Sequence, residues 1–259
     1  MNSADPTNAA DADQTPLPEA HAENSDLKMG RGAAVGLALL GACLLVLVCV
    51  AVFPIFRLPL RLSAPFPPPE VAIEREQVRS WDYMMNASLA LGLFGALVAG
   101  LLATGESFAQ GFRARRILNI VLAIIAGAAL GVASGLLGHY LSGQLKLIKP
   151  ISPMGSTVIV QMVTLAVLGI GMGIGSGFAA GGRRAIVSQA ILGAVAGLLA
   201  GLLFLPACAL AAPLVKTGAV VPGGVVDGRE EWLGLVIWAG LMALFIGLLL
   251  PNVRRRKKT

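Results

Sequence analysis

The feature that most constrains this chain is a series of six long runs without a charged side chain. Each run holds at least 19 residues, and none contains Asp, Glu, Lys or Arg. Because an α-helix rises 1.5 Å per residue, about 20 residues cross the roughly 30 Å hydrocarbon core of a bilayer. The sequence therefore predicts six transmembrane segments, at residues 33–56, 84–104, 117–141, 156–180, 185–212 and 232–250.

The composition and the pattern of these runs predict helices. Hydrophobic residues make up 56% of the 259 residues and charged residues only 13%, which is more apolar than a soluble domain. Lipid offers no partner for backbone N–H and C=O groups, so a spanning segment is a helix or part of a closed barrel. The runs lack the alternation of barrel strands. We expect an all-α fold, a polytopic membrane bundle of six transmembrane helices within residues 28–253.

Three polar segments lie outside the predicted spans. Residues 1–27 are rich in Ala, Asp, Asn, Pro and Glu and lack aromatic residues. Such a segment buries too little apolar surface to offset its ordering entropy, so we expect a disordered acidic tail. Residues 254–259 form a basic tail. Residues 70–82, which follow a proline-rich stretch, are predicted to form a separate short helix on the outer membrane surface.

The distribution of basic residues predicts the orientation of the bundle. With six spans both chain ends lie on one side, and that side holds 12 of the 20 Lys and Arg residues. Cytoplasmic segments of membrane proteins carry an excess of these residues. We therefore expect a bacterial-type cytoplasmic membrane with both termini in the cytoplasm. The predicted topology anchors are Arg113, Arg115, Arg116, Arg183, Arg184, Arg254, Arg255, Arg256, Lys257 and Lys258.

A two-helix hairpin recurs in the middle of the chain. The segment Phe-Ala-Gln-Gly-Phe-Arg at 108–113 resembles Phe-Ala-Ala-Gly-Gly-Arg at 178–183, and each lies between two apolar runs. The same offset of 70 residues pairs Gly127 with Gly197. Self-similarity at a fixed offset is typical of a duplicated structural unit. We predict a tandem repeat of the second and third spans by the fourth and fifth, both entering the membrane from the same side.

Glycines are spaced for close packing of the spans. Small residues four apart share one helix face and let two backbones approach, so that van der Waals contacts hold helices together in lipid. In the fourth span five glycines alternate from Gly169 to Gly177, on two opposite faces. We expect this span to be central, with its glycine run helical or locally unwound. The predicted helix-packing residues are Gly92, Gly100, Gly127, Gly131, Gly135, Gly169, Gly171, Gly173, Gly175, Gly177, Gly193, Gly197 and Gly201.

The spans lack the groups that chemistry inside a membrane usually needs. No predicted span contains a carboxylate or an ammonium group, which argues against an ion-coupled carrier. Neither His21 nor His139 has a metal-ligand companion nearby in the sequence. The sequence contains no Gly-x-x-x-x-Gly-Lys nucleotide-binding loop. We expect no enzyme activity, no catalytic, metal or cofactor-binding residue, and no nucleic-acid partner.

Two functions fit this pattern. The first is a non-enzymatic structural or assembly role through the glycine-rich helix faces. Its expected partners are the lipid bilayer, a second copy of the chain or another membrane protein, and anionic lipid at the basic C-terminus. The second is a channel or facilitator for a small uncharged solute, lined by the fourth span. Polar residues inside the spans, such as Gln161, Thr164 and Gln189, would serve that path.

The predicted orientation can be tested with a single cysteine at Pro67, in a variant that lacks the three native cysteines. We expect Pro67→Cys to react with a membrane-impermeant thiol reagent in intact cells, because the predicted topology places residues 65–69 outside. A cysteine at Thr259 is the control, and it should react only after permeabilisation. Labelling of Pro67→Cys only after permeabilisation would overturn the orientation.

Overall fold

The computed structural model describes residues 30–51, 69–109, 114–145, 152–211 and 230–250. Within these ranges the chain forms six α-helices and no strand, which confirms the predicted all-α fold. The N-terminal and C-terminal tails predicted at 1–27 and 254–259 lie outside the described residues. The helices are α1 (Arg31–Ala51), α3 (Pro69–Ala109), α4 (Ala114–Leu145), α5 (Pro153–Ala180), α6 (Arg183–Ala211) and α7 (Glu230–Leu249).

Five of these helices, α1 and α3 to α6, are long and apolar enough to cross a membrane. Their apolar stretches contain 19 to 30 residues, which matches the thickness of a hydrocarbon core. The corresponding stretch of α7 is shorter, Gly234–Leu249. The protein is therefore a helical membrane bundle, and the crossing of the bilayer by α7 stays a prediction.

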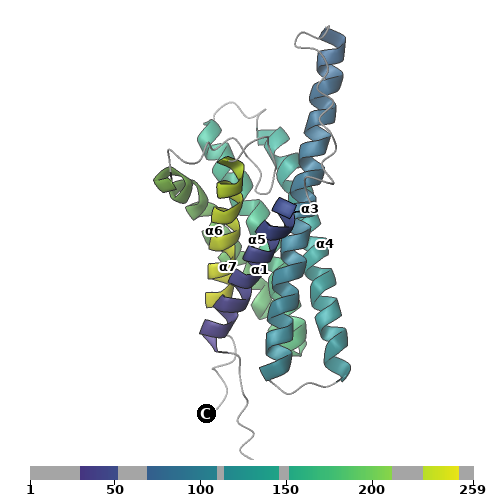
Figure 1. Cartoon of the computed structure of the whole chain (residues 1–259), viewed down its shortest axis with the longest axis vertical. Helices are drawn as coiled ribbons and strands as arrows, with labels where there is room; N and C mark the ends of the chain where they lie inside the picture. The colour runs from purple at the N-terminus through teal and green to yellow at the C-terminus, as the bar shows by residue number, and fades with distance from the viewer. Residues whose placement is uncertain (1–29, 52–68, 110–113, 146–151, 212–229, 251–259) are drawn as a thin grey trace, which may run out of the picture.

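The prediction of a separate surface helix at residues 70–82 is wrong. These residues form the first turns of α3, which runs without a break for 41 residues. At 1.5 Å per residue α3 is about 60 Å long, and its N-terminal part projects beyond the other helices (Figure 1). The sequence contains a signal for this continuity, because residues 70–90 include no Pro or Gly that would end a helix.

A two-residue turn joins α5 to α6. Gly181 and Gly182 have φ angles of 75° and 98°, in a region where other residues are strained. The N–H of Gly181 donates to the carbonyl of Gly177 over 3.1 Å. The carbonyl of Gly182 accepts from the N–H groups of Ala185 and Ile186, at 3.1 and 3.2 Å. The turn thus ends one helix and starts the next, so α5 and α6 pack antiparallel.

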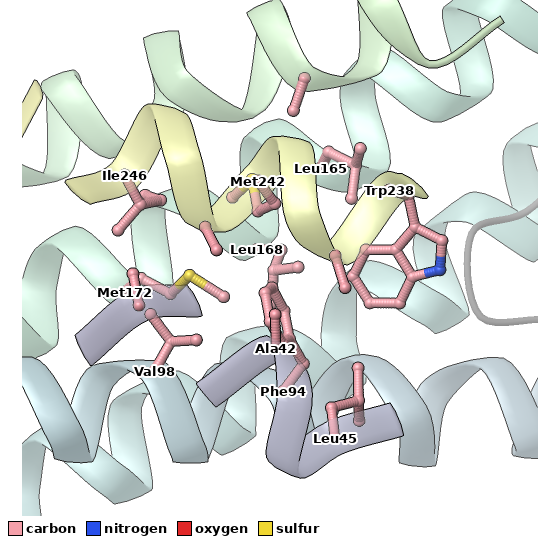
Figure 2. Packing of buried hydrophobic residues seen from close by; sticks show 14 of the residues in the cluster. Ala42, Leu45, Phe94, Val98, Leu165, Leu168, Met172, Trp238, Met242 and Ile246 are labelled. Atoms are coloured by element: carbon pink, nitrogen blue, oxygen red, sulfur yellow. The ribbon is translucent and has the colours of Figure 1, made fainter. Parts of the chain in front are cut away.

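One apolar core joins α1, α3, α5, α6 and α7. In it Phe94 of α3 meets Trp238 of α7 edge-on, with ring centroids 5.1 Å apart and planes at 83°, a favoured aromatic geometry. Leu168 and Met172 of α5 and Met242 of α7 lie beside this pair (Figure 2). All five side chains are buried. They fill the space between α3, α5 and α7.

The fourth predicted span, α5, lies at the centre of the bundle. It contacts α3, α4, α6 and α7. Of the membrane-spanning stretches, those of α3 and α5 are 67% and 56% buried, whereas those of α1, α4 and α6 are 28 to 39% buried. The helices therefore fall into two classes, an inner class with α3 and α5 and an outer class with α1, α4 and α6.

The described core predicts that replacing Trp238 destabilises the protein much more than replacing Trp81. Trp238→Ala should lower the free energy of unfolding by about 3 to 5 kcal/mol, because it leaves a cavity between α3 and α7. Trp81→Ala is the matched control and should change stability little, since the Trp81 side chain is 58% exposed. Titration of both purified variants with a denaturing detergent measures the difference. Equal losses for the two variants would contradict the described core.

Candidate functional site

Helices α5 and α6 meet along a line of glycines that we call the α5–α6 seam. A methyl group added at any of these glycines would lie within 3.0 Å of the backbone of the other helix. Side chains do not occur at such distances, so only glycine permits this approach. The seam is thus backbone against backbone. It consists of Gly169, Gly173 and Gly177 from α5 and Gly193, Gly197 and Gly201 from α6.

A second contact of the same kind, the α3–α4 seam, joins α3 to α4. Gly95 and Gly127 face each other, so that a methyl group on either would strike the carbonyl of the other. A methyl group on any of the three α4 glycines would lie within 3.0 Å of the α3 backbone. The seam consists of Gly127, Gly131 and Gly135 from α4 and Ser88, Leu91, Gly92 and Gly95 from α3.

Gly95 was not among the packing residues predicted from the sequence. Gly92 and Gly100 were predicted as the packing face of α3. Gly92 belongs to the α3–α4 seam, because a methyl group on Gly131 would lie 2.7 Å from Gly92 Cα. The nearest atoms to a methyl group on Gly92 or Gly100 itself belong to side chains. A methyl group there would lie 2.7 Å from Val132 Cγ2 and 2.8 Å from Ile124 Cγ1. The stripe that meets α4 is Gly95, Ala99, Ala103 and Ser107, which has the same spacing of four. The spacing of this stripe is present in the sequence, but alanines, which are common throughout the spans, do not distinguish it from other apolar faces.

The second glycine face of α5 packs against α3 and α4. A methyl group on Gly171 would lie 2.7 Å from Leu130 Cβ, and one on Gly175 would lie 2.9 Å from Ala99 Cβ. Helix α5 is continuous through this run, so the glycines are helical and not locally unwound. All thirteen predicted packing glycines would place an added methyl group within 3.0 Å of another heavy atom.

Several polar side chains lie inside the bundle without a hydrogen bond. Gln161 and Thr164 of α5 are fully buried, and within the described ranges neither side chain has a partner. The same holds for Ser88 Oγ, Gln189 Oε1 and Trp238 Nε1. A buried polar group without a partner is unfavourable by about 1 to 3 kcal/mol. Gln161 is the extreme case, because both its amide nitrogen and its amide oxygen are unpaired.

The described part of the chain contains no group of three His, Cys, Asp or Glu residues that could hold a metal ion. Two of its buried hydroxyl groups, those of Ser107 and Ser134, donate to carbonyl groups of their own helices. Ser107 Oγ donates to the Ala103 carbonyl and Ser134 Oγ to the Gly131 carbonyl, both over 2.7 Å. These two hydroxyls therefore serve the helices that carry them.

Basic residues gather at one end of the bundle, which we call the basic end. Helices α4 and α6 begin there, and α3 and α5 end there. Arg116 Nη1 donates to the carbonyl of Ser107 over 3.0 Å and so ties the start of α4 to the end of α3. Arg183 and Arg184 are exposed at the start of α6. The side chains of the other predicted anchors, Arg113, Arg115, Arg254, Arg255, Arg256, Lys257 and Lys258, lie outside the description.

Adding one methyl group to the α5–α6 seam should destabilise the protein. Gly173→Ala would bring the new methyl group against the Gln189 carbonyl and 2.9 Å from Ala190 Cα, and overpacking typically costs about 1 to 3 kcal/mol. Gly240→Ala in α7 is the control, because no atom lies within 4 Å of its added methyl group. The control should be neutral or stabilising by up to about 1 kcal/mol. Equal melting temperatures of the two purified variants would contradict the backbone contact.

Comparison with known proteins identifies no relative of this chain. No protein-family model matches the chain, and no curated protein or solved structure matches it significantly.

Proposed function

We propose that this protein is a non-enzymatic structural or assembly component of a membrane. The observation that carries the proposal is the α5–α6 seam, in which six glycines place two backbones in direct contact. Close backbone contact along a helix pair maximises van der Waals attraction, which replaces the hydrophobic effect between helices in lipid. A bundle joined by two such seams is suited to be a compact, persistent element in a membrane assembly.

The apolar outer surface supports a role within the membrane. Exposed side chains of α4 and α6 include Ile125 and Ile191, which are 56% and 60% exposed. Such surfaces match lipid tails or the helices of another membrane protein. We propose the lipid bilayer and a second copy of the chain or another membrane protein as partners, with anionic lipid at the basic C-terminus.

The orientation belongs to the same proposal. Arg116, Arg183 and Arg184 lie at one end of the bundle, and clustered Arg residues favour the cytoplasmic side. We therefore place the basic end and both termini in the cytoplasm, in a bacterial-type cytoplasmic membrane.

A channel for a small uncharged solute is the second candidate, and Gln161 is the observation in its favour. Unpaired polar groups inside a membrane protein commonly mark a functional path. Against this candidate, Leu130 and Ala99 cover the second glycine face of α5, and Met172 and Trp238 fill the space between the inner helices. These contacts favour the packing role over a path along α5.

Solute flux separates the two candidates. In proteoliposomes that contain the full chain, we expect no glycerol or urea uptake above that of protein-free liposomes, measured by stopped-flow light scattering. A glycerol facilitator reconstituted in the same lipid is the positive control. Uptake that Gln161→Leu abolishes would establish the channel and overturn the structural role. Gln144→Leu is the matched control for that outcome, because Gln144 is exposed at the end of α4.

A further inference from the structure

The chain alternates between two directions through the bundle. Helices α4 and α6 start at the basic end, and α1 starts there too, because Val35 in its second turn packs against Gly247 at the end of α7. Helices α3, α5 and α7 run the opposite way and end there. Three consecutive pairs, α1–α3, α4–α5 and α6–α7, therefore each leave the basic end and return to it.

The contacts between these pairs close into a ring. Within a pair, α1 contacts α3, α4 contacts α5, and α6 contacts α7. Between pairs, α3 contacts α4, α5 contacts α6, and α7 contacts α1. Each of α1, α4 and α6 thus lies against the returning helix of its own pair (α3, α5 or α7) and against that of one neighbouring pair. Three units around an axis would make six such contacts, three of each kind. Among the returning helices, α5 contacts both α3 and α7, and α3 meets α7 through Phe94 and Trp238.

The three returning helices, α3, α5 and α7, carry similar residues at several positions that are 70 residues apart. We call each set of three such positions a step. At three steps all the residues are small and buried. The members of these steps are Ala99, Gly169 and Ala239, then Ala103, Gly173 and Ala243, then Ser107, Gly177 and Gly247. Two further steps carry large apolar side chains, all of them in the one core cluster. These are Val98, Leu168 and Trp238, then Leu102, Met172 and Met242.

The third set of small residues, Ser107, Gly177 and Gly247, lies in each case beside the first turns of an outer helix. Ser107 accepts a hydrogen bond from Arg116 near the start of α4. A methyl group on Gly177 would lie 2.5 Å from the Cα of Ile186 near the start of α6, and one on Gly247 would lie 2.5 Å from the Cα of Val35 near the start of α1. The outer helices are therefore in comparable register beside their inner partners.

We infer that α1–α3, α4–α5 and α6–α7 are three copies of one two-helix unit, arranged about a common axis. Helices α3, α5 and α7 surround that axis, and the two large apolar steps fill it. Helices α1, α4 and α6 form the outer wall. This arrangement extends the predicted duplication to a third copy and moves the boundary of the unit by one helix. It also assigns the third pair contact, α7–α1, as the equivalent of the two glycine seams.

Three outward-facing positions test the arrangement in the full chain. Leu40, Val121 and Ile191 each lie five residues after one of the three outer-helix neighbours, Val35, Arg116 and Ile186. Their side chains are 47%, 44% and 60% exposed, so spin labels there leave the packing intact. In a variant without the native cysteines, cysteines are introduced two at a time and labelled, and the three distances are measured by double electron–electron resonance in lipid nanodiscs.

We expect three distances that agree within about one helical turn, 5.4 Å, as for the corners of an equilateral triangle. Moving the α6 label from Ile191 to Leu202, about 16 Å along the helix, is the control and should lengthen both distances that involve α6. One distance close to the sum of the other two would place the outer helices in a row and overturn the threefold arrangement. The result is independent of the flux experiment, so the two proposals can fail separately.

Discussion

The direct contact between the backbones of α5 and α6 is the interaction on which the rest of the bundle depends. Lipid tails are as apolar as the helices, so burial of apolar surface contributes little to helix association in a membrane. Attraction must then come from the number and closeness of atomic contacts. Glycines at Gly169, Gly173 and Gly193 remove the side chains that would separate the two helices. Because α5 also packs against α3 and α4, this contact locates the central helix for all the others.

Much of this arrangement could be predicted from the sequence, because it depends on spacing. Alternating glycines from Gly169 to Gly177 predicted a helix with two close neighbours, and α6 on one side and α4 on the other are those neighbours. The contact at Gly95 was missed, because alanines on the same stripe resemble ordinary apolar lining. Unpaired Gln161 could not be predicted, since its burial depends on which helices surround it and not on its own position in the sequence.

The glycine seams and the large apolar side chains between α3, α5 and α7 have the same mechanical effect. Both oppose sliding or tilting of one helix past another. The three-unit arrangement adds a reason for the filled axis, since equivalent positions such as Leu102, Met172 and Met242 converge there. Gln161 departs from this pattern, because its equivalent on α3 is the apolar Leu91. Packing alone does not explain this departure, or the other buried polar atoms without a partner, such as Thr164 Oγ1 and Ser88 Oγ.

The separation of α5 and α6 in a lipid bilayer shows whether their backbones are in direct contact. An experimental structure of the full chain in nanodiscs would measure the distance between the two helix axes at Gly173. We expect a value below about 8 Å, the lower limit of ordinary helix packing. A separation of about 9 to 10 Å, with side chains or lipid between the backbones, would contradict it.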